Sequence, residues 1–157
     1  MQLTKQTNHA LRILMFCASR DEPVRVRDIA AFYNLSEQFL HKTLQLAANA
    51  GFVETIRGRN GGVKLSRPAA DIRVGDVVRA IEDRFEMADC FSPDSNCPLE
   101  QACNLSAALR RALQAFFDVL NDYTIADLVD NRASINVLAE LEAMMSIPLD
   151  RDAQAAR

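Results

Sequence analysis

The chain has 157 residues, of which 49% are hydrophobic, enough to bury one core and to carry a small second subdomain. It contains no run of eighteen apolar residues, which excludes a membrane-spanning helix, and it opens without an apolar signal segment, so we expect a cytoplasmic protein. Residues 1–75 carry eleven Lys and Arg against six Asp and Glu, and residues 76–157 carry seven against fifteen, so the first half is expected to meet phosphate and the second half to repel DNA.

Two helices are predicted at the N-terminal end. Apolar residues recur at helical spacing from position 10 to position 17, and Thr4 or Thr7 can cap this first helix. Cys17 lies on its apolar side, where a free cysteine behaves as a small buried hydrophobe. A second, short helix is predicted near residues 25–33, and Asn34 suits a left-handed residue at its C-terminal end.

A third helix is predicted over Glu37–Ala50, with Ser36 as its cap and Gly51 as its end. The turn before it is short enough for a helix-turn-helix, whose second helix presents its N-terminal residues to the major groove of DNA. The stripe expected to be buried consists of Leu40, Leu44, Ala47 and Ala50. The residues that point away from this stripe, which we predict to contact DNA, are Ser36, Gln38, His41, Lys42 and Gln45.

A β-hairpin is predicted after the third helix, with strands over Phe52–Arg57 and Val63–Ser66. The connection between them carries two guanidinium groups, and Asn-Gly at its tip accepts the positive φ angles of a tight turn. Such a wing suits a narrow, strongly negative minor groove. A nucleotide-binding loop is disfavoured, because the GxxxxGK[ST] pattern and a following helix are missing. The wing residues predicted to contact DNA are Arg57, Arg59, Asn60 and Gly61.

A fourth helix over residues 74–81 leads into a loop with three cysteines, Cys90, Cys97 and Cys103, in a C-x6-C-x5-C arrangement. Zinc sites usually take their ligands from Cys pairs about two to four residues apart, and no such pair occurs. An iron–sulfur cluster accepts looser spacing, and three thiolates would leave one iron without a protein thiolate, which makes a cluster labile. Zinc, a thiol–disulfide switch and a solvated loop with unrelated thiols stay open, whereas a structural disulfide framework is the least expected in a reducing cytoplasm.

The longest periodic segment, Asn104–Tyr123, predicts a helix about 30 Å long. Its apolar face is too wide for a small partner, and Phe117 is placed on the flank of that face. We interpret it as a helix that crosses its twin in a homodimer, since helix-turn-helix proteins normally bind paired half-sites. The interface residues predicted on it are Leu109, Leu113, Phe116 and Leu120.

The C-terminal part is predicted to contain short helices. Thr124 and Asp127 resemble a capping box for a helix that runs through Val129, and Ser134 is expected to start another that runs through Met145. The remaining tail has no apolar face and is expected to fray.

Three stretches together resemble a known family: LTKQTNHALRILMFCA, the hairpin VETIRGRNGGVKLSRPAADIRVGDVV, and the spaced cysteines ahead of ALRRALQAFFDVLNDYTIADLV. Over nearly the whole chain they are similar to the winged-helix iron–sulfur regulators, the family that includes IscR, NsrR and RirA. The segments TKQTN, ETIRGRNGG and ADLV, together with the cysteine spacing, are most similar to the RirA type, the rhizobial iron regulators. The resemblance implies a dimeric repressor that binds palindromic double-stranded DNA with its cluster intact and releases it when iron is scarce.

The resemblance also implies that the three loop cysteines hold the cluster, as [4Fe–4S], with [2Fe–2S] as a degraded or alternative form. Family members that take a fourth ligand from a histidine three residues after the last cysteine have Ser106 here, and members that take it from a carboxylate early in the first helix have Asn8 here. His9 is adjacent, but one step along a helix rotates a side chain by about 100°. An exogenous ligand is therefore expected, which favours iron sensing over nitric-oxide sensing.

These observations predict a mainly α-helical fold with a small β-hairpin wing. We expect a winged helix-turn-helix domain over 1–75, a linker helix and cysteine loop over 76–103, a dimerisation helix with C-terminal helices over 104–146, and a disordered tail over 147–157. The expected function is an iron-responsive DNA-binding repressor. The alternatives are a repressor that responds to nitric oxide or oxidative stress, and a zinc- or thiol-based redox switch. No Ser/His/Asp set, carboxylate pair or nucleotide fingerprint supports an enzyme.

Overall fold

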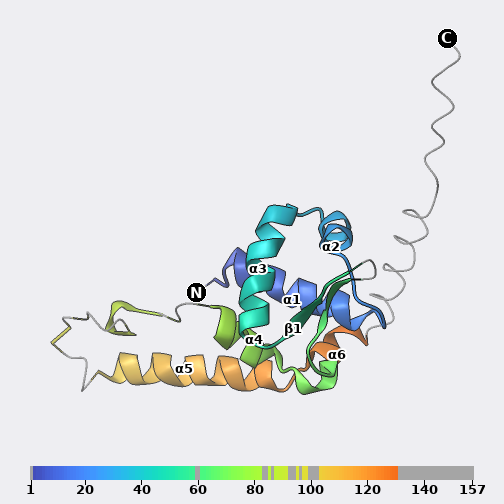
Figure 1. Ribbon diagram of the computed structural model, residues 1–157. Coiled ribbons are helices and arrows are strands. Elements are labelled where there is room, and N and C mark those ends of the chain that lie inside the picture. The colour runs from blue at the N-terminus through green and yellow to red at the C-terminus, as the bar shows by residue number, and fades with distance from the viewer. Residues whose placement is uncertain are drawn as a thin grey trace, which may run out of the picture.

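The computed structural model describes residues 2–58, 61–82, 85, 87–91, 95, 97–98 and 103–130. Three helices and a two-stranded hairpin form one unit, and a long helix runs along its side next to the fourth helix (Figure 1). This arrangement confirms the expected mainly α-helical fold with one small hairpin. The elements are α1 (Lys5–Ala18), α2 (Val26–Tyr33), α3 (Glu37–Asn49), β1 (Val53–Ile56), β2 (Gly62–Leu65), η1 (Ala69–Asp71), α4 (Val74–Ile81), η2 (Asp89–Phe91), α5 (Asn104–Asn121) and α6 (Ile125–Val129).

Local signals set most helix ends. Thr4 is the N-terminal cap of α1, and its hydroxyl accepts a hydrogen bond from the Thr7 backbone N–H at 3.3 Å. Asn34 follows α2 in the left-handed region with φ 51°, as predicted. Ser36 precedes α3 as predicted, but its side chain makes no capping hydrogen bond. Because Ser36 and the first residues of α3 are exposed, water can satisfy the free N–H groups of that turn instead.

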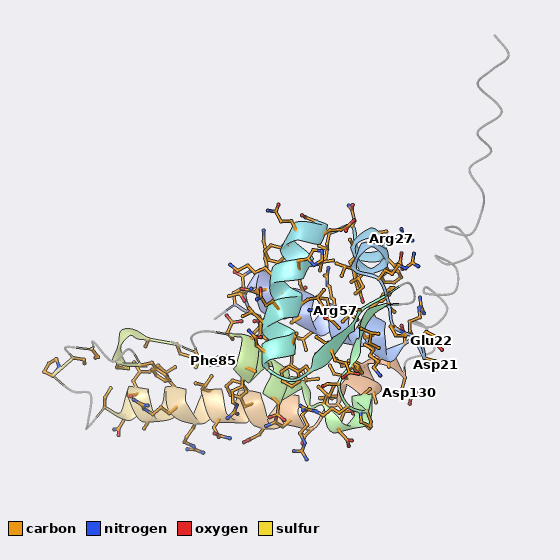
Figure 2. The ribbon with its side chains drawn as sticks, in the orientation of Figure 1. Asp21, Glu22, Arg27, Arg57, Phe85 and Asp130 are labelled. Atoms are coloured by element: carbon orange, nitrogen blue, oxygen red, sulfur yellow. The ribbon has the colours of Figure 1, made fainter. Side chains whose placement is uncertain are left out.

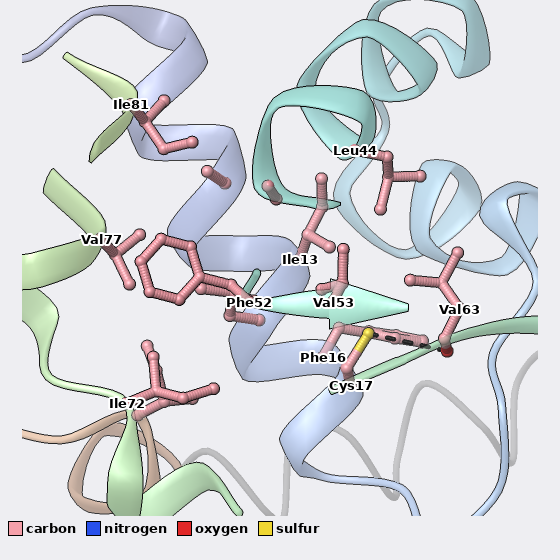
Figure 3. Close-up of a cluster of buried hydrophobic side chains, with 14 of the residues drawn as sticks. Ile13, Phe16, Cys17, Leu44, Phe52, Val53, Val63, Ile72, Val77 and Ile81 are labelled. Atoms are coloured by element: carbon pink, nitrogen blue, oxygen red, sulfur yellow. Dashed lines mark hydrogen bonds between the residues drawn. The ribbon is translucent and has the colours of Figure 1, made fainter. Parts of the chain in front are cut away.

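The core forms where the other elements enclose α1. This helix lies against α3, α4, α6 and β2, and Figure 3 shows its Ile13 and Phe16 among side chains from the hairpin and α4. Ile13, Leu40 and Val77 have no exposed surface. Burying a side chain of this size contributes about 1.5–3 kcal/mol. Because these contacts come from α1, α3 and α4 together, the core fixes α3 relative to the end of α4, where the cysteine loop begins.

The hairpin is an antiparallel pair in which Thr55 faces Val63 and Ile56 faces Gly62. Each strand differs from its predicted range by one residue at each end. Val24, ahead of α2, exchanges both backbone hydrogen bonds with Val63 at 2.8 Å. Gly62 lies at this junction, where a Cβ would come within 2.6 Å of the Val24 carbonyl oxygen. The hairpin is thus joined to the helical unit along β2.

The chain returns to α1 after the long helix. Thr124 and Asp127 form the predicted capping box of α6, and the hydrogen bonds that the Thr124 hydroxyl and backbone N–H donate to the Asp127 carboxylate hold the pKa of Asp127 below its usual range. Ile125 is fully buried, and its N–H donates to the Ile72 carbonyl oxygen at 2.8 Å. The helix predicted over 134–145 and the predicted tail lie outside the described residues. Within the described ranges, no helix combines the length and the apolar character needed to cross a membrane.

Candidate DNA-binding surface and cysteine loop

The outward side of α3 carries the polar residues that were predicted to contact DNA. Its inward side is closed into the core by Leu40, Leu44 and Ala47. The predicted contact residues on α3 and at its cap are all exposed, namely Ser36, Gln38, His41, Lys42 and Gln45. Their exposure confirms the predicted orientation of α3, the candidate recognition helix, and their contact with DNA stays a prediction.

Helical periodicity alone missed an aromatic contact beside these residues. Phe39 is 37% exposed on the flank of α3, and its ring meets the His9 ring edge to face, with 4.9 Å between the ring centres and 89° between the ring planes. Burial lowers the pKa of His9, and the positive charges of Arg12 and Lys5 lower it further. His9 thus favours its neutral form in a ring contact that joins α1 to the candidate recognition helix.

Contacts at the base of the hairpin hold it beside α3. Lys64 and Glu54 pair across the two strands at 3.0 Å. The Arg67 guanidinium lies 5.2 Å from the centre of the Phe52 ring and donates to the Gly51 carbonyl oxygen at 3.4 Å. Because Gly51 directly follows α3 and its cap, the wing and the recognition helix keep a defined relative position.

The tip of the hairpin departs from the prediction. Arg57 is exposed directly after β1, as a DNA contact requires (Figure 2), whereas Arg59 and Asn60 lie outside the described residues. A positive φ angle was predicted for the Asn60-Gly61 pair, and for Gly61 this prediction was wrong, because the glycine with a positive φ in the described part of the tip is Gly58, at 112°. Gly61 is half-buried and donates its N–H to the Gly58 carbonyl oxygen at 3.0 Å. A Cβ at Gly61 would collide with the last carbonyl oxygen of β1. Glycine is therefore required there by the lack of room for a side chain and not by the φ angle.

The three cysteines of the loop are free thiols. Cys90 is half-buried in η2, Cys97 is exposed, and Cys103 is half-buried at the N-cap position of α5. Such partly accessible thiols are soft donors that suit zinc or the iron of a cluster. Among the described side chains, however, no group of three or more His, Cys, Asp or Glu is arranged to hold a metal ion. The structure thus supplies the donor chemistry without gathering the three thiols.

One contact places the Cys90 segment on α5. Phe91 closes η2 through its N–H, which donates to the Ala88 carbonyl oxygen at 2.9 Å, and the Arg110 guanidinium lies 4.9 Å from the centre of the Phe91 ring. Arg110 follows Cys103 by seven residues, which is close to two helical turns, so both lie on one face of α5. The segment that carries Cys90 therefore contacts α5 about two turns beyond Cys103.

The positions at which related regulators were expected to supply a fourth ligand differ in their surroundings. Ser106 is only 3% exposed within α5, so a larger side chain there would displace its neighbours. Asn8 is exposed on α1, whereas the Nδ1 atom of His9 is buried and has no hydrogen-bond partner among the described residues. The His9 ring packs against Phe39 of α3.

Cys17 is a core residue, as predicted. It is 4% exposed, and its thiol donates to the Val63 carbonyl oxygen at 3.9 Å. Burial raises the pKa of Cys17 to about 12. Because the thiolate is the form that binds metals, this residue stays apart from the chemistry of the loop.

The long helix α5 has an apolar face that the described part of the chain does not cover. Leu105 and Val119 are 65% and 57% exposed. The four residues predicted at a dimer interface are half-buried, namely Leu109, Leu113, Phe116 and Leu120. Phe117, which was predicted on the flank, is instead the residue of α5 that enters the core, between the Phe85 ring at 4.8 Å and the Arg79 guanidinium at 4.1 Å. Only one edge of the apolar face therefore packs against α4 and its continuation.

Comparison with known sequences identifies relatives of nearly the whole chain. The Rrf2 family model, described as an iron-dependent transcriptional regulator, matches residues 3–131. Protein aau3 of Rhizobium meliloti (strain 1021) is 56% identical over 144 residues, which cover 90% of this chain and 94% of that protein. The HTH-type transcriptional regulator NsrR of Geobacillus kaustophilus (strain HTA426) is 44% identical over 141 residues, which cover 88% of this chain and 96% of that protein.

Solved structures show the same architecture. The oxidized form of Staphylococcus aureus CymR matches with a TM-score of 0.67 at 26% identity, over 83% of this chain and 98% of that one. IscR of T. potens matches with a TM-score of 0.66 at 23% identity, over 82% of this chain and 86% of that one, which supports the fold alone. The winged-helix fold is thereby confirmed, and the matched proteins whose role is stated are transcriptional regulators rather than enzymes.

Proposed function

The chain belongs to the Rrf2 family of transcriptional regulators, and on that premise we propose that it is a repressor that senses iron through a labile iron–sulfur cluster. The observation that carries the proposal is the position of free thiols at the junction with α5: Cys90 lies in a turn that packs on α5 through Phe91, and Cys103 begins that helix. A group bound by thiols at this junction would constrain the connection between the DNA-binding helices and α5.

Cys90, Cys97 and Cys103 would hold the cluster, which supplies an iron-dependent cross-link within the loop. Three thiolates suit a [4Fe–4S] cluster, with [2Fe–2S] as a degraded or alternative form. Ser106 is buried and His9 packs on α3, so the fourth position would go to water, hydroxide or an exogenous thiol. An iron without a protein thiolate leaves readily, which suits a sensor of iron supply.

We also propose that two copies of the chain associate through α5 and present two recognition helices to a palindromic operator. The exposed Leu105 and Val119 support this arrangement, because by helical spacing they lie on the same side of α5 as the four predicted interface residues, and an exposed apolar face marks an interaction site. A two-fold symmetric dimer buries the same helix face from each copy and places two α3 helices for two half-sites.

A thiol- or zinc-based redox repressor is the second candidate. It is favoured by one observation, that all three loop cysteines are free and at least partly accessible, and the similarity to the oxidized form of Staphylococcus aureus CymR agrees with it. A variant of the first proposal is a cluster-containing repressor that responds to nitric oxide or oxidative stress, and the similarity to NsrR agrees with this variant. Zinc and thiols are colourless, so visible absorbance separates the two candidates.

Removal of the cluster is expected to release operator DNA. Protein purified without oxygen should be brown, and EDTA should bleach it while operator binding weakens by about tenfold to a hundredfold, equivalent to about 1.4–2.8 kcal/mol of coupling. Absorbance and DNA-binding fluorescence anisotropy are recorded on the same anaerobic sample. A brown protein whose operator affinity does not change on bleaching would rule out the cluster as the sensor, and a colourless, iron-free protein would favour the thiol repressor.

Variants of the DNA-binding surface are expected to separate phosphate contacts from base contacts. Arg57→Ala should weaken binding to every sequence and reduce the salt slope by about one unit, whereas Gln38→Ala should lose about 1–3 kcal/mol of discrimination at one base pair. Asn49→Ala, exposed at the far end of α3, is the matched control and should bind normally. Equal losses by Gln38→Ala on operator and random DNA would show that α3 does not contact bases there.

A further inference from the structure

A carboxylate at the entrance to the cysteine loop closes the N-terminal end of α1. Glu82 directly follows α4, and its Oε2 atom accepts hydrogen bonds from the Thr4 backbone N–H at 3.2 Å, from the Thr4 hydroxyl at 3.1 Å and from the Thr7 hydroxyl. Figure 1 shows this end of α1 beside the end of α4. Thr7 has no exposed surface, so its hydroxyl depends on partners within the protein. A negative charge is also favoured at the N-terminus of a helix.

The same turns of α1 contact the candidate recognition helix. His9 lies two residues after Thr7, and its ring packs edge to face on Phe39 of α3. The Nδ1 atom of His9 is buried without a hydrogen-bond partner in the described part of the chain, so the described contacts of this ring are packing contacts. Phe39 follows Gln38 and precedes His41 by two residues. A shift of the first two turns of α1 would therefore move the His9 ring against Phe39, and with it the turn of α3 that carries the proposed DNA contacts.

Because α4 is fixed in the core, a movement of the cysteine loop would be passed to Glu82 rather than to α4. Val78 and Ile81 are buried in the core, so α4 holds the backbone just before Glu82 in place. On the other side, Cys90 follows Glu82 by eight residues. A rearrangement of the loop would thus act on Glu82 before it could move α4.

We propose that Glu82 is a positioning residue for the recognition helix, which holds the N-terminal turns of α1 against α3 through Thr4 and Thr7 while the cysteine loop is in its DNA-binding state. The state of the loop in this scheme rests on the proposed function. Glu82 acts through α1 and touches neither DNA nor the thiols, and its role is to make the affinity for operator DNA depend on the loop.

Four variants test this role against a simple contribution to stability. Glu82→Ala removes all three hydrogen bonds, and Thr7→Val removes one hydroxyl without a change of shape. Thr7→Ser restores that hydroxyl, and Asp76→Ala, which removes an exposed carboxylate within α4, is the matched control. Operator affinity is measured for cluster-loaded and stripped protein, with visible absorbance per chain as the measure of loading.

Glu82→Ala and Thr7→Val should each lower the operator affinity of cluster-loaded protein about tenfold, which is the order of the free energy of one charge-assisted hydrogen bond. The same variants should lower the operator affinity of stripped protein by less than about twofold. Thr7→Ser and Asp76→Ala should behave as wild type. Equal losses in the loaded and stripped forms, or no loss in either, would overturn the positioning role.

A second measurement does not depend on a cluster. If the wild-type chain purifies without one, hydrogen exchange is followed at the backbone amides of residues 38–42 in protein as purified. Faster exchange there in Glu82→Ala than in Asp76→Ala supports the link from Glu82 to α3, even where the iron-sensing proposal has failed. Equal exchange in the two variants overturns it.

Discussion

Alanine at Cys90, Cys97 or Cys103 is expected to abolish the visible absorbance of protein purified without oxygen, whereas Cys17→Ala should retain it. Each loop thiolate would be one of only three protein ligands, so the loss of one leaves a second iron without a thiolate. Cys17 is buried, and its raised pKa, about 12, keeps it as a thiol, which makes it the matched control within the same chain.

Iron and acid-labile sulfide per chain, measured together with the visible spectrum, check this expectation. Far-ultraviolet circular dichroism shows whether each variant has folded, which matters most for Cys17→Ala because it removes a sulfur from the core. A folded but colourless Cys17→Ala protein would overturn the assignment of ligands. A Cys97→Ala protein with full visible absorbance would show that the exposed Cys97 thiol is not a cluster ligand.

Val119→Asp is expected to convert the protein to monomers and to lower operator affinity by about a hundredfold or more, because two linked half-sites bind far more tightly than one. A carboxylate at this position would lie unpaired in the helix crossing, at a cost of about 3–5 kcal/mol. Val119 is 57% exposed in the single chain, so the isolated fold should tolerate the change.

Sedimentation velocity and operator binding measure the effect. Ala107→Asp introduces the same charge at an exposed position on the polar side of α5 and should leave the dimer intact. Phe116→Asp is a less clean test, because the Phe116 ring is half-buried and lies 5.3 Å from the core residue Phe117, so a loss of folding would be mixed with a loss of association. A Val119→Asp protein that sediments as a dimer would show that α5 is not the interface.

Local patterns in the sequence determined where helices begin and which side of α1, α2, α3 and α4 is buried. The cap at Thr4, the left-handed Asn34 and the box formed by Thr124 and Asp127 were all predicted and found. Each depends on groups within about four residues of one another, so it forms wherever the rest of the chain lies. The exposure of Gln38 and its neighbours on α3 followed in the same way from the 3.6-residue period.

Contacts between elements were decided only by the tertiary structure. Glu82 meets Thr7 across 75 residues, and no periodicity relates the two positions. The apolar face of α5 is wider than the elements packed on it, so the choice of Phe117 over its neighbour as the core residue depends on where Phe85 and Arg79 lie. A helical period tells which side chains share a face but not which neighbour that face meets, because packing depends on the complementary surfaces of two elements.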